Sequence, residues 1–338
     1  MLTIKHDIRG HCSSICQIAN GYLIAYYLHP ECSDTQRVQL RYITTKNRYK
    51  VLAQYTFYNK TGNCVLISDP TNEYKATIIY SYFNDTDGRK IFTHNVHRWM
   101  YCSNWMADIE IKTNNDQTSI QINNTKPLPT QPTTGFLVRI NPIKIHDQWL
   151  LPMYHENPCY GQIMKSTDTK NWRTSGHIGL RANKLIQPSL WWDGKVLHSL
   201  SRDMSGKGYA WHSYSKDLGE SWSTIQPTNI TNDNNSIAVI NDNTNTPYVI
   251  WNEGEKRHNL MIGKLDGSFS IKPIKKLNNN TNASYPNYCI DNNKIHIVNT
   301  EYSMITHHII DKQELELQNI TQEIMIIDKD LQTRKQTL

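Results

Sequence analysis

The chain has 338 residues, with 36 Lys and Arg against 30 Asp and Glu, and a formal net charge of +6 at pH 7. This small basic excess is spread along the chain without a basic run, which argues against a nucleic-acid partner and suits an anionic sugar better. No segment has the ~20 apolar residues needed to span a bilayer, and 7 cysteines without CxxC spacing argue for free thiols, no zinc and no other cofactor.

Six short apolar runs bounded by turn-forming residues predict antiparallel β-strands along the chain. In chain order they cover residues 22–28, 76–83, 149–154, 195–200, 248–251 and 294–298. Turn sequences directly precede three of them, namely Asn20-Gly21, Asp193-Gly194 and Asp291-Asn292-Asn293, as in meandering hairpins. Continuous helical periodicity is absent until the C-terminal end, so the chain is predicted to be all-β.

Two segments do not follow this pattern of short strands separated by turns. Residues 114–134, rich in Asn, Thr, Gln and Pro, are expected to form a long connection between groups of strands. After about residue 312 the apolar residues follow a 3-4-3-4 helical spacing, at Leu317, Ile320, Ile324, Ile327 and Leu331. We therefore expect a β-domain over residues 1–311 and an extension over 312–338, whose helix either packs on the domain or mediates self-association.

The segment from Ser215 to Trp222 fits the pattern Ser-x-Asp-x-Gly-x-x-Trp. In such a box, Ser and Asp hydrogen-bond the backbone of a tight β-turn, Gly supplies a positive φ, and Trp packs beneath the hairpin. A shorter copy without the Gly ends at Trp172, 50 residues earlier, and a degraded third copy ends at Phe269, 47 residues later. Repeats of ~40 to 50 residues are typical of propeller blades, and six blades would use nearly the whole chain.

Together with these boxes, an ordered series of segments resembles the BNR-repeat (Asp-box) sialidase-like, or neuraminidase-like, family. The segments are His11–Ile15, Asn20–Leu23, His29–Asp34, Leu137–Arg139, Leu151–Glu156, Gln187–Leu190, Leu200–Asp203, Asn234–Ser236, Arg257–Leu260, Ser284–Pro286 and Ile305–His307. The resemblance implies a six-bladed β-propeller of sialidase type. It also implies an exo-acting glycoside hydrolase that releases a terminal acidic sugar from a glycan.

The resemblance further implies three catalytic roles, because sialidases attack with a Tyr assisted by a Glu and protonate the leaving group with an Asp. Carried over position by position, Asp34 is the acid/base, Glu156 the partner of the nucleophile and Tyr285 the nucleophile. A neutral phenol avoids the repulsion that a carboxylate nucleophile would meet from an anionic sugar. Tyr normally titrates near ~10, so Glu156 would have to withdraw its proton.

Sialidases also clamp the substrate carboxylate with three arginines, whose planar guanidinium groups meet a carboxylate bidentately. Arg202 and Arg257 match two of these positions. Where the family has Arg-Ile-Pro, this chain has Arg9-Gly10-His11, so either Arg9 serves as the third or His11 has replaced it.

Three more residues are candidates for the site. His155 and Glu156 end an apolar strand with an abrupt change of polarity, which usually points into a cleft, so His155 is a further catalytic candidate. Gln187 and His307 lie in segments that carry the resemblance and are candidate substrate-binding residues.

Each assignment has a structural alternative. Asp34 could cap a turn, and Tyr285, followed by Pro286, could be a core residue at a strand end. Arg202 could pair with the adjacent Asp203, and Arg257 could be a solvated charge in a turn.

Two other functions also fit the sequence. A carbohydrate-binding propeller without catalysis would explain the missing third arginine. A polysaccharide lyase could use His11, His155 and His307, beside Tyr285 and Arg202, to neutralise a uronate and abstract its α-proton. In each case the partner is an acidic glycan.

The sequence also predicts where the site lies in the propeller and in which compartment the protein is found. We expect the site residues, which come from different blades, to meet at one mouth of the central channel, with the Asp-box turns at the opposite rim. No secretory signal is visible, and with the free thiols this favours the cytoplasm without fixing the compartment.

Overall fold

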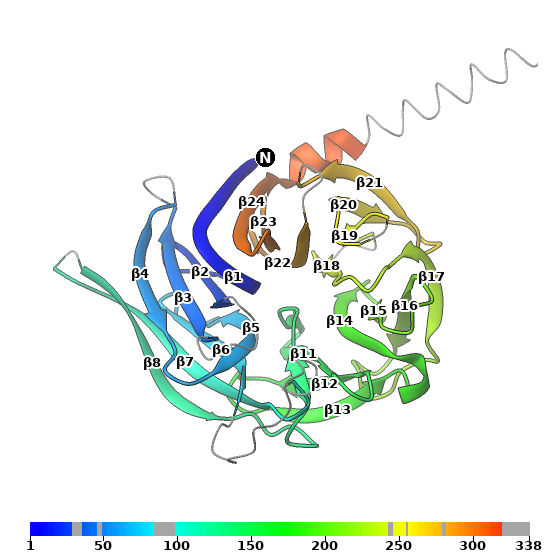
Figure 1. Ribbon diagram of the computed structural model, residues 1–338, viewed down its shortest axis with the longest axis horizontal. Coiled ribbons are helices and arrows are strands. Elements are labelled where there is room, and N and C mark those ends of the chain that lie inside the picture. The colour runs from blue at the N-terminus through cyan, green and yellow to red at the C-terminus, as the bar shows by residue number, and fades with distance from the viewer. Residues whose placement is uncertain are drawn as a thin grey trace, which may run out of the picture.

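The computed structural model describes residues 1–28, 36–45, 49–83, 99–115, 117–242, 246–254, 256–278 and 282–319. In these ranges the regular structure is nearly all antiparallel β-strand, arranged in sheets around a central axis (Figure 1). Four sheets have four or five strands, and one has seven.

The seven-stranded sheet consists of two blades that share one long strand, β1 (Leu2–Ile18). Residues 2–9 of β1 pair with β24 (Met304–Asp311), whereas residues 10–18 pair with β2 (Gly21–Leu28). The sheets therefore make up six blades, and β1 joins the first to the last. The predicted six-bladed β-propeller is confirmed.

The strands follow one another from the central axis outward in each blade. Blade 1 has the second half of β1, then β2, β3 (Val38–Thr44) and β4 (Val51–Thr56). Blade 2 has β5 (Thr61–Ser68), β6 (Lys75–Tyr82), β7 (Ser103–Asn114) and β8 (Gln117–Pro127). Blade 3 has β9 (Phe136–Val138) and β10 (Ile143–Ile145) innermost, then β11 (Gln148–His155), β12 (Tyr160–Ser166) and β13 (Arg173–Ile178).

Blade 4 follows a 3₁₀ helix, η2 (Arg181–Asn183), and has β14 (Leu185–Trp192), β15 (Leu197–Asp203), β16 (Tyr209–Ser215) and β17 (Gln226–Thr231). Blade 5 has β18 (Ala238–Ile240), β19 (Tyr248–Asn252), β20 (Leu260–Leu265) and β21 (Ile271–Lys276). Blade 6 has β22 (Ala283–Asp291), β23 (Lys294–Glu301), β24 and the first half of β1.

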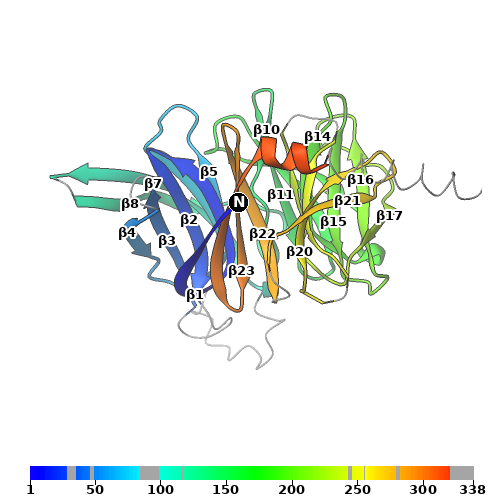
Figure 2. The same ribbon diagram turned by 90° about the horizontal axis from the view of Figure 1, so that it is seen from above.

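The expectation of a long connection over residues 114–134 is wrong for most of that segment. Residues 117–127 form β8, which pairs with β7 in a hairpin that extends beyond the ring (Figures 1 and 2). The physical reason is the alternation around Ile120 and Ile122, which turn inward while the intervening polar side chains face solvent. Only the stretch between β8 and β9 is a connection.

The Asp-boxes occupy equivalent turns, between the third and fourth strands of blades 3 and 4, as their spacing predicts. In blade 4, Asp217 accepts hydrogen bonds from Ser215 and Ser221, and Gly219 has a φ of 89°. In the shorter copy, Asp168 accepts from the amides of residues 170 and 171, and Thr169 has a positive φ (61°), as Leu218 does at the same position of the blade 4 box (55°). The degraded copy occupies the same turn of blade 5, where Asp266 accepts from two further amides.

The chain leaves the last blade through a helix over residues 312–319. Leu315 is fully buried in the apolar cluster between blades 5 and 6, and Glu314 pairs with Lys275 of β21. The helix therefore packs on the propeller over its described length. The later apolar positions of the expected self-association helix, Ile320 to Leu331, lie outside the described residues. No helix in the ranges given above has the length and apolar character needed to cross a bilayer.

Candidate functional site

Four innermost strands carry a β-bulge near the end where the strand enters its blade, which for β1 is the start of its second half. In β1, β5, β14 and β22 the pairing skips two residues, which are Cys12–Ser13, Gly62–Asn63, Gln187–Pro188 and Tyr285–Pro286. The φ values of Cys12, Gln187 and Tyr285 are 51°, 53° and 56°, a region that non-glycine residues rarely adopt. Bulges redirect side chains, and here one residue of each pair lines a common pocket.

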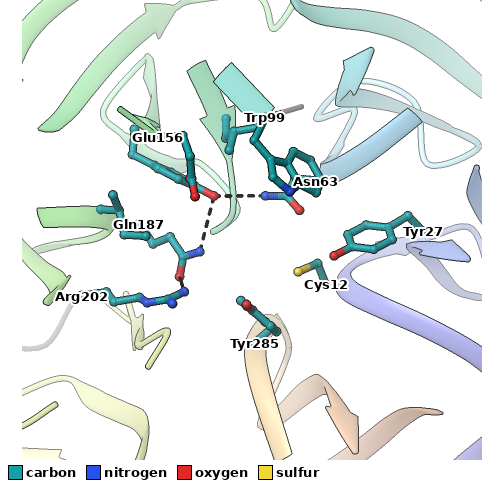
Figure 3. A pocket seen from close by; sticks show the side chains of 11 residues that line it. Cys12, Tyr27, Asn63, Trp99, Glu156, Gln187, Arg202 and Tyr285 are labelled. Carbon is teal, nitrogen blue, oxygen red and sulfur yellow. Dashed lines mark hydrogen bonds between the residues drawn. The ribbon is translucent and has the colours of Figure 1, made fainter. Parts of the chain in front are cut away.

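The pocket lies at this end of the central axis and has a volume of about 360 Å³, including its open mouth (Figure 3). Its lining residues come from blades 1 to 4 and 6 and from the segment before β7: Cys12, Tyr27, Asn63, Trp99, Leu137, Tyr154, Glu156, Ile186, Gln187, Arg202 and Tyr285. Most of them are buried, whereas Glu156 and Tyr285 are partly exposed. A ligand in the pocket would meet these two residues and the charged head of Arg202.

Three guanidinium groups surround the ring of Tyr285. The Cζ atoms of Arg257, Arg139 and Arg202 lie 4.7, 5.3 and 6.0 Å from the ring centroid. Arg257 also donates a hydrogen bond from Nη2 to the Tyr285 hydroxyl, at 3.0 Å. His11 packs edge-on against the same ring, with 4.7 Å between the centroids. The phenol therefore sits in a strongly cationic environment.

Arg202 is oriented into the pocket by neutral partners. Its Nε donates to Asn234 and its Nη1 to Gln187, at 2.8 and 3.1 Å. The adjacent Asp203 instead accepts hydrogen bonds from the hairpin that follows β15, including one from Trp211. Successive side chains of a strand point to opposite faces, so the alternative of an Arg202–Asp203 pair is not what the structure shows.

A second tyrosine forms part of the wall. The Tyr154 hydroxyl accepts hydrogen bonds from Asn63 (3.1 Å) and Gln187 (3.4 Å), which links blades 2, 3 and 4 (Figure 3). Burial raises the pKa of Tyr154 well above its usual value, and the nearby Glu156 carboxylate adds to this effect. Tyr154 is therefore a neutral structural phenol, in contrast to the more exposed Tyr285.

Next to the pocket, the residues between β9 and β10 reach from blade 3 to the innermost strands of blades 1 and 6. Arg139 donates to the carbonyl oxygens of Ser13, Tyr285 and Pro286. Asn141 donates to the carbonyl oxygens of Ile15 and Tyr288. We refer to residues 139–142 as the strap. It ties the innermost strands of blades 1, 3 and 6 together.

Some expected site residues lie elsewhere. Arg9 is exposed where β1 pairs with β24, so it contributes no pocket charge. His155 stacks on Tyr160 and packs against Phe136, outside the pocket lining, because its side chain points to the face opposite Glu156. His307 is fully buried within blade 6, where its Nε2 hydrogen-bonds His296. A substrate contact does not fit these positions. Asp34 lies outside the described residues.

Four lining residues, Cys12, Asn63, Trp99 and Tyr154, were not expected from the sequence. The same is true of the strap residue Arg139, which lies outside the lining and contacts Tyr285. Arg139 lay in a segment that carries the resemblance, but nothing local indicated its partners more than 100 residues away. Among the described residues, no group of three or more His, Cys, Asp or Glu side chains is arranged to hold a metal ion.

The pocket and the Asp-box turns lie at opposite ends of the propeller. The pocket residues lie where innermost strands begin and second strands end, whereas the boxes follow third strands. The first and third strands of an antiparallel blade run in the same direction, so the end of a third strand is opposite the start of the first. Figure 2 shows the ring from the side, with loops at both ends.

Comparison with known proteins gives a family and a fold. A family model described as BNR repeat-like domain matches residues 48–297. Among curated proteins no match was found.

Among solved structures, Trypanosoma rangeli sialidase in complex with 2,3-difluorosialic acid, described as a covalent intermediate, is 12% identical with a TM-score of 0.66, covering 95% of this chain and 56% of that one. A protein of unknown function from Dyadobacter fermentans is 12% identical with a TM-score of 0.68, covering 92% and 97%. The NanB sialidase from Streptococcus pneumoniae is 10% identical with a TM-score of 0.61, covering 92% and 70%. The chain thus spans little more than half of the trypanosomal enzyme's length, and these identities establish a shared fold alone.

Proposed function

Because the chain belongs to the BNR repeat-like domain family, we propose that it is an exo-acting glycoside hydrolase of sialidase type that releases a terminal acidic sugar from a glycan. The observation that carries this proposal is the environment of Tyr285. A phenol that is partly exposed in a pocket, hydrogen-bonded by Arg257 and close to Arg202, is suited to an anionic sugar. The sialidase fold of the solved relatives supports the same conclusion.

In the proposed reaction, Arg202 and Arg257 bind the carboxylate of the sugar. The Tyr285 oxygen attacks the anomeric carbon while the bond to the leaving oxygen breaks, and Glu156 accepts the phenolic proton. Asp34, as the acid/base, donates a proton to the leaving oxygen. Water then attacks the anomeric carbon and gives a proton to Asp34, while the bond to Tyr285 breaks and Glu156 returns its proton to the phenolate oxygen.

The single-site pocket supports an exo-acting mode. Eleven residues line one compact pocket of about 360 Å³ on the propeller axis. A pocket of this size suits one terminal sugar, whereas an endo-acting enzyme needs a groove that holds sugars on both sides of the scissile bond.

A panel of acidic glycosides with chromogenic leaving groups tests the proposal, with products identified by mass spectrometry. The panel should include α-linked sialic acids and β-linked uronic acids. We expect release of the free acidic sugar without an unsaturated product. Incubation with a 2,3-difluoro analogue of the preferred sugar should add one sugar mass to the peptide containing Tyr285. Release of an unsaturated sugar, or no product from any substrate, would overturn the hydrolase.

A carbohydrate-binding propeller is the second candidate, and the third arginine position favours it. Cys12 lines the pocket and His11 contacts Tyr285, while Arg9 is exposed elsewhere. In that case acidic sugars would bind without any product. The lyase has less support, because of the three histidines it would use only His11 lies beside Tyr285.

A further inference from the structure

Arg139 is a buried cation without a carboxylate partner. Its side chain is among the largest that are fully buried, with 1% of its surface exposed. Its hydrogen bonds go to three main-chain carbonyl oxygens, and no ion pair joins it to any residue within the described ranges. Its Nε atom has no hydrogen-bond partner there either. Carbonyl dipoles solvate a guanidinium group but leave its net charge in place.

The positive charge of Arg139 lies close to Tyr285, where it can act on an acidic ligand in the pocket. The guanidinium lies 5.3 Å from the Tyr285 ring centroid, outside the pocket lining, while Arg202 and Arg257 approach the same ring. The strand that would carry a third arginine presents Cys12 to the pocket instead. The site therefore has three cations around the Tyr285 ring: Arg202 lines the pocket, Arg257 binds the phenol hydroxyl, and Arg139 is buried outside the lining. In these surroundings of low dielectric, charge acts over longer distances.

The same guanidinium holds the backbone that presents Tyr285. It bonds the carbonyl oxygens of Tyr285 and Pro286 in β22 and that of Ser13 in β1. Tyr285 has a φ of 56°, a conformation that a tyrosine keeps only when its surroundings fix it. A planar guanidinium spreads several donors in fixed directions toward both strands, whereas an ammonium group has its three donors on a single atom.

We propose that Arg139 is the third cation of the site and the positioning residue of Tyr285, acting from outside the pocket lining rather than by touching substrate. The proposal rests on the proposed function of the pocket as an acidic-sugar site. It assigns to Arg139 two separable effects. Its charge favours acidic over neutral sugars, and its hydrogen bonds keep Tyr285 in place for attack.

The charge is tested by calorimetric binding of matched acidic and neutral probes. The probes are N-acetylneuraminic acid and glucuronic acid, each paired with its methyl ester, and the ratio of the two affinities defines acid preference. We expect Arg139→Gln to lower this ratio about 10-fold or more, and Arg139→Lys to retain it. Asn141→Ala is the matched control, because it removes strap hydrogen bonds without changing charge. It should lower stability but leave the ratio unchanged.

The positioning effect is tested by turnover. Arg139→Lys keeps the charge but replaces the two donor nitrogens that bond the three carbonyl oxygens with one, so kcat should fall about 10-fold or more while KM changes little. This variant also covers the case in which Arg139→Gln fails to fold. Wild-type turnover in Arg139→Lys, or an unchanged acid preference in a folded Arg139→Gln, would overturn the inference and leave the proposed function intact. A wild-type protein without preference for either acid would overturn both.

Discussion

At the scale of single residues, chemically similar side chains in and around the pocket differ in their burial and in their hydrogen bonds, and so in their expected roles. Tyr154 and Tyr285 both line it, but Tyr154 is buried and accepts two hydrogen bonds, whereas Tyr285 is partly exposed and receives one from Arg257. Arg139 and Arg202 are both nearly buried, yet one bonds main-chain carbonyls and the other faces the cavity. These differences can be tested by conservative substitutions.

Tyr285→Phe removes the attacking oxygen and leaves the ring in place. We expect kcat to fall by at least about 1,000-fold, with substrate affinity changed by less than about 3-fold. Single-turnover kinetics and calorimetry would measure the two quantities. Tyr154→Phe serves as a control that removes a wall hydroxyl and should keep far more turnover. Wild-type turnover in Tyr285→Phe would rule out the tyrosine mechanism and favour the lyase.

Arg202→Ala should weaken binding of an acidic sugar by roughly 2 to 5 kcal/mol, because a buried charge pair with the substrate is lost. Gln187 and Asn234 also lose their shared partner. Titration of the preferred acidic sugar gives the affinity. Lys207→Ala removes an exposed cation from the hairpin after β15 and should leave the affinity as it is. Equal losses in the two variants would point to general charge rather than to the pocket.

The sequence predicts some of these residues and not others for a definite reason. Glu156, Arg202, Arg257 and Tyr285 lie in segments that carry the family resemblance, so their positions could be read directly. Cys12 and Asn63 reach the pocket because of bulges in β1 and β5, and neither bulge has a local signal as clear as the Pro that follows Tyr285. Arg139 depends on contacts between segments 126 to 147 residues apart.

At the scale of elements, all six strands predicted from apolar runs are the second strands of the six blades: β2, β6, β11, β15, β19 and β23. A second strand has a neighbour on each side and another blade on each face, so most of its residues are buried, as in β19. Outer strands such as β4 and β17 bury few residues and carry a weak pattern. The apolar runs of the second strands therefore predict the number of blades, whereas the prediction of a connection at β8, an outer strand, is wrong.

The Asp-box turns also link neighbouring blades. Glu220 in the box of blade 4 binds Lys165 and Arg173 of blade 3, at 2.6 and 2.5 Å, and accepts a hydrogen bond from Ser175. Lys170 in the box of blade 3 reaches Asp108 and Thr77 of blade 2 in the same way. Each turn thus contacts the preceding blade, a role in addition to that of a local folding signal.

Removing Glu220 tests this link. Arg173 is the main cause of the lowered pKa of Glu220, to about 2, followed by Lys165. For stability, however, we expect the contact with Lys165 to matter more than the contact with Arg173. The Lys165 side chain is only 3% exposed, whereas that of Arg173 is 57% exposed. We expect Glu220→Ala to lower the free energy of unfolding by about 1 to 3 kcal/mol, because it leaves the buried Lys165 ammonium group without its carboxylate partner. Urea denaturation measures this change.

Arg173→Ala is the matched control, because it removes only the exposed partner of the same carboxylate. It should cost less than about 1 kcal/mol. A larger effect from Arg173→Ala than from Glu220→Ala would contradict the view that the buried Lys165 contact holds the two blades together.

At the scale of the whole molecule, the joint between the last and first blades contains a cluster of buried histidines. His6 of β1, His296 of β23, and His307 and His308 of β24 are each less than 7% exposed. Burial lowers the pKa of His6, His296 and His308 to about 4, with Arg41 adding to the effect at His6, and it lowers the pKa of His307 well below its usual value. All four are therefore neutral in the folded protein near pH 7.

Stability should consequently fall as the pH is lowered from about 6.5 to about 4. In this window the unfolded chain binds protons at its histidines, with a pKa near ~6.5, while the folded protein does not. Each such histidine contributes a slope of up to about 1.4 kcal/mol per pH unit. Urea midpoints at pH 7, 5.5 and 4.5 would measure the trend.

His6→Phe should reduce this slope, because it removes one of the four histidines and keeps a flat ring beside His307. The Asp-box carboxylates do not account for the effect, since the pKa of both Asp168 and Asp217 is about 2 and their protonation begins at lower pH. A slope in His6→Phe as steep as in the wild-type protein would show that the joint is not the acid-sensitive part.

The division of β1 between two blades has a consequence for folding on the ribosome. Residues 2–9 emerge early, but their partner β24 begins at Met304. At ~5 to 20 residues per second, about 15 to 60 s pass before that partner has been made. During this interval the second half of β1 can form its blade, while the first half remains an unpaired edge available to other chains. Domain exchange between nascent chains through residues 2–9 is therefore the misassembly to which this topology is most exposed.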